Sequence, residues 1–272
     1  MCADRGHGAA GVAARLVADP AAGPVHQRGG GRVVLIDIVT VSATGSTNAD
    51  LLAAAASGAP EGRWLRAECQ TAGRGRQGRS WESRSGNLYA STLVRLRPSD
   101  PSAATLALVA AIAVDEAVQL ICADLATSGR LAIKWPNDVL VDGAKLVGIL
   151  LERADDAVII GIGVNCGQQP IGLGRATTSL AECGCLIDPA VLLEVLASAF
   201  AKWLNRWRVE GIAPVRARWL ERAHPRGTAL VARVGDSATE GLFDGLDEGG
   251  ALRLRLADGT VRVIHAADVF LL

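Results

Sequence analysis

The chain has 272 residues, half of them hydrophobic and 21% charged, and this composition excludes an intrinsically disordered protein. Its 28 Lys and Arg residues balance 28 Asp and Glu residues. A net charge of zero supplies no global basic field, so nucleic acid or an anionic membrane surface would have to bind at a local basic patch.

Residues 1–31 are rich in Gly, Ala and Arg, and we expect a disordered low-complexity leader with a short helix near residues 10–18. Strands are predicted at 33–36 and 38–41. A helix over 48–56 follows, which Ser46 or Thr47 would cap with help from Asp50 in the first turn. A strand at 64–68, a long Gly- and Arg-rich loop and a strand at 87–94 come next.

An apolar segment at 103–124 predicts a long buried helix. Asp115 and Glu116 lie in its middle, which argues against a membrane span and leads us to expect a cytoplasmic protein. A short strand at 132–135 precedes a hairpin, 139–141 and 145–151, that turns at Asp142-Gly143. A strand at 157–164 and helices at 188–209 and 214–223 complete this part.

After Pro225 the pattern changes to four short alternating strands at 228–234, 239–243, 251–256 and 260–265, separated by tight turns. So many short strands in so few residues predict a small barrel. The expected domains are therefore the leader at 1–31, a main domain at 32–224 and a C-terminal barrel at 225–272.

Six cysteines occur, and none of them forms a Cys-x-x-Cys pair. We therefore expect reduced thiols in preference to zinc ligands or disulfides.

The most informative stretch runs from Gln70 to Trp81 and contains three Gly and three Arg. The glycines allow the backbone to bend so that several N–H groups can point at one anion. The arginines add planar, fork-shaped donors for phosphate or carboxylate. Two other interpretations stay open at this point: a solvated Arg-rich loop, or a binder of single-stranded nucleic acid.

A second stretch joins Lys134-Trp135-Pro136-Asn137-Asp138 to Lys145. Only three lysines occur in the chain, and two of them lie within these twelve residues. Asp138 is a candidate ligand for a hard cation and Lys145 a candidate point charge for a phosphoryl or carboxylate oxygen. The alternative is an ordinary turn. The pair Gly161 and Gly163 is interpreted as tight-turn geometry, and P-loop, His-Glu-x-x-His and Gly-x-Ser-x-Gly motifs are absent from the sequence.

Taken in order and spacing, these stretches resemble the biotin protein ligases, over about residues 33–272. The joined strings that carry the resemblance are Gly45-Ser46-Thr47-Asn48, Gly73-Arg74-Gly75-Arg76 with Arg79 and Trp81, Lys134 to Asp138, Lys145 to Leu151 and Gly161 to Asn165. The resemblance implies an α+β fold, with a catalytic domain like that of class II aminoacyl-tRNA synthetases (a mixed sheet flanked by helices) and a C-terminal SH3-like barrel.

The activity that the resemblance implies is the ATP-dependent activation of biotin to biotinyl-5′-AMP, followed by transfer to a lysine of a biotin carboxyl carrier domain. It implies catalytic roles for Lys145, Arg74 and Arg76 and a magnesium site at Asp138. It implies that biotin is bound by Ser46, Thr47, Asn48, Gln70, Gly73, Arg74, Gly75, Arg76 and Lys145. It implies that ATP and its phosphates are bound by Arg76, Arg79, Trp81, Asn137, Asp138 and Asn165.

The partner expected on this basis is the carrier domain of acetyl-CoA carboxylase or a related carboxylase, and the protein is expected to be a monomer or a weak homodimer. Regulatory members of the family carry an N-terminal helix-turn-helix of some sixty residues, whereas about thirty precede the first strand here, so no DNA binding is expected. A lipoate-type ligase on the same fold is the alternative enzyme, and a nucleic-acid-binding module is the alternative outside enzymes.

Overall fold

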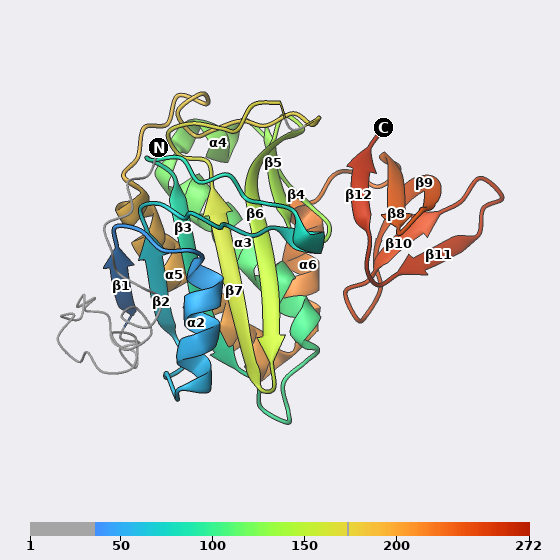
Figure 1. The fold of residues 1–272 in the computed structure, drawn as a ribbon. Helices are drawn as coiled ribbons and strands as arrows, with labels where there is room; N and C mark the ends of the chain where they lie inside the picture. Colours follow the sequence, from blue (N-terminus) through green and yellow to red (C-terminus); the bar gives the residue numbers. More distant parts are fainter. Residues whose placement is uncertain (1–35, 173) are drawn as a thin grey trace.

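The main body of the protein is a seven-stranded sheet with helices on both faces (Figure 1). The structure, a computed structural model, describes residues 36–172 and 174–272. The strand order is β1-β2-β3-β7-β6-β5-β4, in which β1 and β2 are parallel and all other neighbours are antiparallel. The strands are β1 Asp37–Val41, β2 Arg63–Ala67, β3 Leu88–Arg95, β4 Leu131–Lys134, β5 Asp138–Val141, β6 Ala144–Ala154 and β7 Ala157–Val164.

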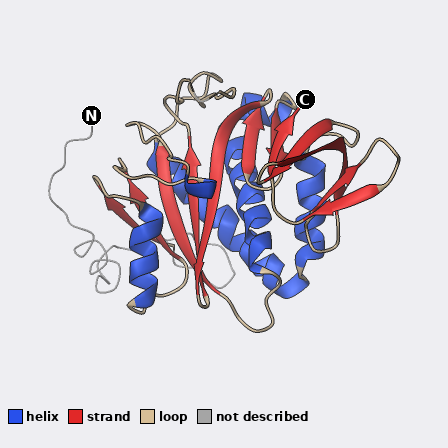
Figure 2. Ribbon diagram, turned by 45° about the vertical axis from the view of Figure 1, so that its right-hand side comes forward, coloured by secondary structure: helices blue, strands red, loops and turns tan. Residues whose placement is uncertain are grey.

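Three long helices cover one face of this sheet, and one shorter helix covers part of the other (Figure 2). The first group consists of α3 Leu106–Ile121, α5 Pro189–Glu210 and α6 Ile212–Arg222. Helix α3 packs against β6 and β7, α5 packs against β3, and α6 packs against α3, α5 and β4. The short helix α4 Ala123–Thr127 follows α3. On the opposite face, α2 Thr47–Ala56 buries Leu51 and Ala54 against Leu93 and Ile159. A mixed sheet flanked by helices confirms the predicted α+β class.

The C-terminal strands form a separate five-stranded antiparallel sheet of order β11-β10-β9-β8-β12. Its strands are β8 Ala229–Val234, β9 Ser237–Leu246, β10 Leu252–Arg255, β11 Val261–Ile264 and β12 Asp268–Leu271. The sequence predicts the first four. It misses β12, because a four-residue strand is too short to show a clear alternation of apolar and polar residues. This strand forms by pairing with β8. The boundary between residues 224 and 225 stays a prediction.

The predicted elements otherwise match the structure, apart from their ends and one misread pair of glycines. The predicted strand at 33–36 lies largely, and the leader wholly, outside the described residues. Gly161 and Gly163 do not form a turn. Both lie inside β7 in extended conformation, and their function is to remove two side chains from one face of the sheet.

The expectation of reduced thiols is wrong for Cys122 and Cys185 in the described part of the chain. Cys122, at the end of α3, is joined to Cys185, which precedes α5, with Cα atoms 5.7 Å apart. Sequence spacing cannot show this, because 63 residues separate the two sulfurs and the fold alone brings α3 and the start of α5 together. Cys166 and Cys183 carry free thiols.

The segment from Ala103 to Ile121 is apolar enough, with a mean hydropathy of 1.8, to resemble a membrane-spanning helix in composition. Two thirds of it is buried within the fold, where it packs against α5 and α6. The carboxylate of Asp115 within it is fully buried and forms an ion pair with Arg222 of α6, at 2.9 Å. The buried charge is therefore compensated. A core helix accounts for its composition.

His224, just after α6, should make folding stability pH-dependent. Burial lowers the pKa of its imidazole to about 4, with a smaller contribution from Lys134, whereas an exposed histidine titrates near 6.5. The unfolded chain therefore binds a proton that the folded chain refuses, and stability falls as the pH falls from about 6.5 to 4. We expect a loss of about 2 kcal/mol over this range.

Urea unfolding between pH 7 and pH 4 tests this expectation. His224→Phe should flatten the stability profile, while His265→Phe, at an exposed position, should leave it unchanged. An unaltered slope in His224→Phe would assign the pH dependence to other groups.

Candidate functional site

A cavity of about 350 Å³ opens where the start of α2, the Arg-rich loop, the β4–β5 turn and the C-terminal sheet meet. All the site residues predicted from the sequence line this cavity except Gly73 and Asn165. The Nδ2 of Asn165 instead donates to the carbonyl oxygen of Thr178 at 3.0 Å, on the segment that follows β7. Gly73 packs between Gln70 and the backbone of Trp81. Asn165 and Gly73 therefore contact neighbouring loop segments and do not line the cavity.

The closed end of the cavity is polar and almost fully buried. Thr47 and Asn48 are 3% and 4% exposed, and Gln70 Oε1 accepts the Thr47 N–H at 2.9 Å. Ser46 is the N-cap residue of α2 and Asp50 lies in the first turn, as predicted, but the Ser46 side chain makes no capping hydrogen bond. Asp50 accepts a hydrogen bond from Thr44 instead. The first residues of α2 therefore face the cavity.

Three glycines form the floor on β6 and β7. A Cβ at Gly148 or Gly163 would stand 2.5 or 2.6 Å from the ring of Trp81, and one at Gly161 would stand 2.2 Å from Asn48 Oδ1. Real Cβ atoms do not approach so closely, so only glycine lets the indole and the amide lie on the sheet. Trp81, expected from the resemblance to bind ATP, lies with its ring against this floor.

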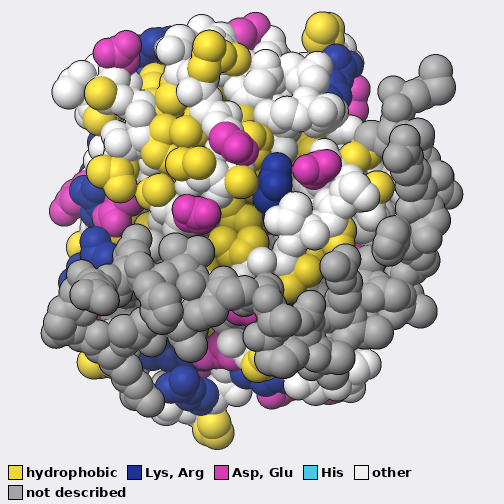
Figure 3. Space-filling view, turned by 90° about the vertical axis from the view of Figure 1, so that its left-hand side faces the viewer, with side chains coloured by type: hydrophobic (Ala, Val, Ile, Leu, Met, Phe, Trp, Pro, Cys, Tyr) yellow, Lys and Arg dark blue, Asp and Glu magenta, His cyan; other side chains and the backbone are white. Residues whose placement is uncertain are grey.

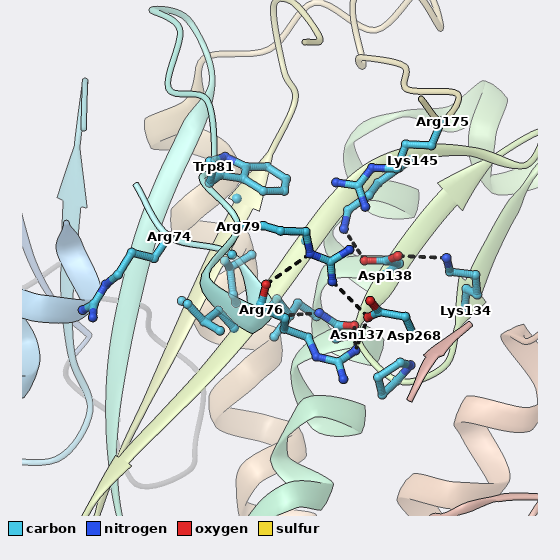
Figure 4. Close-up of a pocket in the computed structure, with 18 of the residues that line it drawn as sticks. Arg74, Arg76, Arg79, Trp81, Lys134, Asn137, Asp138, Lys145, Arg175 and Asp268 are labelled. Atoms are coloured by element: carbon cyan, nitrogen blue, oxygen red, sulfur yellow. Dashed lines mark hydrogen bonds and ion pairs between the residues drawn. The ribbon is translucent and has the colours of Figure 1, made fainter. Parts of the chain in front are cut away.

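The Arg-rich loop brings two guanidinium groups to one carboxylate of the C-terminal sheet (Figure 4). Asp268 Oδ1 lies 2.9 Å from Arg79 and 3.7 Å from Arg76. Arg76 also donates to Asn137 Oδ1 at 3.1 Å and to the carbonyl oxygen of Ala267 at 3.2 Å. The two guanidinium groups are thereby held side by side at the cavity wall.

Arg74 points away from this pair (Figure 4). Its guanidinium meets Glu152 on β6 at 3.0 Å. The loop thus directs Arg76 and Arg79 to one end of the cavity and Arg74 to the other, although the three residues alternate closely in the sequence.

Lys145 and Lys134 share the buried carboxylate of Asp138. Lys145 Nζ pairs with Asp138 Oδ1, and Lys134 Nζ lies 3.0 Å from Oδ2 and donates to the carbonyl oxygen of Val269. Burial lowers the pKa of Lys145, which Asp138 partly offsets. Burial alone would raise the pKa of Asp138, but the two ammonium groups, Lys145 first, bring it below its ordinary value. At neutral pH the carboxylate is ionised.

The described residues include no cluster of side chains that could hold a metal ion by itself, and magnesium at Asp138 stays a prediction. Within residues 36–172 and 174–272, no three His, Cys, Asp or Glu side chains lie close enough to hold a metal ion. Both oxygens of Asp138, the predicted ligand, are already paired with lysines. This carboxylate orients Lys145 in the structure.

Several cavity residues were not predicted from the sequence. Lys134 carried one signal, its rarity in an Arg-rich chain. Asp268 and Arg175 carried none, since the first lies on the missed strand β12 and the second on a segment without regular structure. Six basic side chains and two acidic ones line the cavity: Arg74, Arg76, Arg79, Lys134, Lys145, Arg175, Asp138 and Asp268. A chain of zero net charge therefore holds a local basic site, suited to anions.

The side chains visible at the β1 edge show no comparable gathering of basic groups (Figure 3). In Figure 3 the visible Lys and Arg side chains of that face are interspersed with Asp and Glu. Of the two regions, the cavity is the one whose charge suits an anionic ligand.

Known proteins resemble both parts of the chain. The Biotin/lipoate A/B protein ligase family matches residues 43–167, and the Biotin protein ligase C terminal domain matches residues 231–272. The biotin–[acetyl-CoA-carboxylase] ligase of Paracoccus denitrificans is 44% identical over 240 residues, which are 84% of this chain and 97% of that protein. The bifunctional ligase/repressor BirA of Bacillus subtilis is 37% identical over 78% of this chain and 66% of its own length.

Solved structures agree with these sequence matches. The biotin protein ligase of Aquifex aeolicus in complex with biotin and ATP superposes with a TM-score of 0.76 at 26% identity, covering 87% of this chain and 99% of that one. The Leishmania major enzyme in complex with biotinyl-5-AMP gives a TM-score of 0.61, also at 26% identity, over 85% and 99% of the two chains.

The cluster of Asp138, Lys134 and Lys145 predicts that substitutions of Asp138 and of Lys145 have unequal effects on stability. Lys145→Met leaves Asp138 paired with Lys134, whereas Asp138→Asn leaves two nearly buried ammonium groups without a carboxylate. We expect Asp138→Asn to lower the free energy of unfolding by about 3 kcal/mol and Lys145→Met by less than about 1 kcal/mol. Urea denaturation at pH 7 measures both, and equal losses would make Lys145 a structural residue.

Proposed function

The chain belongs to the biotin protein ligase family, and we propose that it activates biotin with ATP and transfers it to a lysine of a biotin carboxyl carrier domain. The observation that carries this proposal is the shared cavity. A polar, hydrogen-bonding closed end, a buried lysine and a pair of arginines all line one space.

The first half-reaction joins two anions. A carboxylate oxygen of biotin attacks the α-phosphorus of ATP, the bond to the β-phosphate oxygen breaks, and biotinyl-5′-AMP and pyrophosphate form. Such a step needs charge neutralisation and alignment more than proton transfer. In this proposal Lys145 neutralises the carboxylate and the α-phosphate, and Arg76 and Arg79 bind the leaving phosphates.

In the second half-reaction the amine of the carrier lysine attacks the acyl carbon. The acyl–phosphate bond breaks, AMP leaves and the proton of the amine passes to water. Asn137, which accepts from Arg76, would border the nucleotide in both steps. ATP is the co-substrate. Magnesium at Asp138 stays a prediction, and no step is assigned to it.

Biotin fits the closed end better than lipoate does. Thr47, Asn48 and Gln70 present hydrogen-bonding groups there, and the urea ring of biotin can pair with them. The dithiolane ring of lipoate carries no N–H or carbonyl group, so it would leave the lone pairs of Thr47 Oγ1 without a donor. Unpaired polar groups in such a pocket discriminate strongly between substrates.

The remaining features of the enzyme are inferred from its family. Its substrate is a biotin carboxyl carrier protein, and we propose the carrier of acetyl-CoA carboxylase or a related carboxylase, in the cytoplasm. A monomer or weak homodimer and the lack of specific DNA binding stay predictions.

Pyrophosphate release tests the proposed activity. The purified chain with biotin and ATP, without any carrier, should release pyrophosphate, and adding an apo carrier domain should give a biotinylated lysine. Lys145→Met should fold but lose about 10²- to 10³-fold of the activation rate, since a charge facing developing charge is removed. Lipoate in place of biotin should give little release. Folded wild-type protein that releases none, beside an active control ligase, would refute the proposal.

Arg76 should retain the adenylate as well as bind it. Its guanidinium ties the Arg-rich loop to Asn137 and to the Ala267 carbonyl, so Arg76→Gly removes two attachments and adds backbone freedom. We expect free biotinyl-5′-AMP in solution and labelling of unrelated lysines on added albumin.

Trypsin measures the loop directly, because residues 71–86 contain Arg74, Arg76, Arg79 and Arg84. Biotin with ATP should protect this loop in the wild type and protect it less in Arg76→Gly. Cleavage that ligand does not change, together with no escaping adenylate, would show that the loop is a fixed wall.

A further inference from the structure

A line of hydrogen-bonded side chains runs behind the closed end of the cavity, from Thr47 to Glu152. Thr47 Oγ1 and Ser91 Oγ are 2.7 Å apart, Ser91 Oγ donates to Asn48 Oδ1 at 2.6 Å, and Asn48 Nδ2 donates to Glu152 Oε2 at 2.8 Å. Thr47 and Asn48 line the cavity. Ser91, on β3, is 0% exposed, and Glu152 lies on β6 at the end of the line.

Glu152 fixes the orientation of the Asn48 amide. A carboxylate only accepts hydrogen bonds, so it must face the NH₂ group of Asn48. The carbonyl oxygen of Leu150, 3.4 Å from the same nitrogen, is also an acceptor. If the amide were flipped, its oxygen would face the carboxylate at under 3 Å, which repulsion forbids. Asn48 Oδ1 is therefore turned to Ser91.

The orientation of Asn48 determines that of the two hydroxyl groups. Ser91 has one proton, and Asn48 Oδ1 takes it. The contact of 2.7 Å between the hydroxyls must then use the proton of Thr47. Gln70 Oε1 already accepts the Thr47 N–H at 2.9 Å, and its contact with Thr47 Oγ1 is longer, at 3.1 Å.

Thr47 Oγ1 is left with its lone pairs. Across residues 36–172 and 174–272, no donor other than the hydroxyl of Ser91 lies within hydrogen-bonding distance of it. A ligand group that meets this oxygen must therefore be a donor.

We infer that Glu152 is a positioning residue that sets the hydrogen-bond polarity of the cavity's closed end, so that Thr47 Oγ1 accepts an N–H of the substrate ring. This inference rests on the proposed function, because the urea of biotin supplies that N–H. Glu152 acts through Asn48, Ser91 and Thr47 in turn, each of which has a single arrangement of donors and acceptors once the carboxylate is in place.

Two further contacts support this assignment. Gly161 leaves the space that Asn48 Oδ1 occupies, since a Cβ there would come within 2.2 Å of that oxygen. Glu152 Oε1 pairs with Arg74 at 3.0 Å, with both side chains partly exposed, which makes this ion pair weak beside the buried hydrogen bonds. The oxygen that faces Asn48 is thus the one that matters for the substrate.

The test compares biotin with a biotin methylated on both ring nitrogens, which keeps the ring but lacks its N–H donors. Dissociation constants are measured by titration calorimetry without ATP. Wild type should bind biotin and discriminate strongly against the methylated analogue. Glu152→Leu, which removes the acceptor, should lose about tenfold or more in affinity for biotin and lose most of that discrimination. Glu152→Gln, whose amide oxygen can still accept from Asn48, should restore both to within about threefold.

Ser91→Ala provides a second variant with a minimal change of volume, and it too should lose discrimination, because it frees the Thr47 proton. Equal weakening of both ligands in Glu152→Leu and Ser91→Ala would indicate a general structural effect and overturn the inference, as would unchanged biotin binding in both. A folded wild type that binds no biotin would instead refute the proposed function, and with it this role of Glu152.

Discussion

The carboxylate of Asp138, held between Lys134 and Lys145, is the interaction on which the site depends. It compensates two ammonium groups that would otherwise repel each other in a nearly buried space. It also fixes Lys145 at the cavity wall, beside the ring of Trp81, whose centroid lies 5.6 Å from the lysine nitrogen. Since Asp138 begins β5 and Lys145 lies on β6, the position of this charge is set by the register of two paired strands and does not depend on a flexible loop.

The second sheet completes this arrangement from outside. Lys134 donates to the Val269 carbonyl, Arg76 donates to that of Ala267, and Trp135 Nε1 donates to that of Gly250 at 3.1 Å. Asp268 supplies the carboxylate between Arg76 and Arg79. The C-terminal strands therefore do more than pack against the main domain: they provide backbone acceptors and one counter-charge to the most basic part of the cavity.

Much of the fold was predictable because it rests on local patterns. The apolar periodicity of α3 and α5 and the alternation within β8 and β10 are present in the sequence itself. What was missed depends on contacts between distant residues. Strand β12 forms by pairing with β8, and the Cys122–Cys185 bond joins residues 63 positions apart. The role of Gly161 in β7 depends on the side chain of Asn48, which packs against it.

The site residues likewise fall into those that the sequence predicted and those that it could not. The residues of the Arg-rich loop and of the Lys134–Asp138 turn carry chemistry in contiguous strings, so they could be found. Glu152 meets Asn48 across 104 positions, and Asp268 meets Arg79 across 189. A single acidic residue on a strand carries no local signal of such a partner, because surface glutamates and aspartates are common. Predicting these two contacts would have required the sheet register and the docking of the second sheet beforehand.

The cavity is built directly on the core of the protein. Glycine, charged and amide groups line it together with apolar side chains, and Trp135, Ile149 and Ile162 belong both to this lining and to the larger apolar cluster. Gly148 and Gly163 lower the strand propensity of β6 and β7 where Trp81 lies, and these strands hold because each is paired on both sides. Pairing on both sides therefore lets β6 and β7 carry the glycines that form the cavity floor.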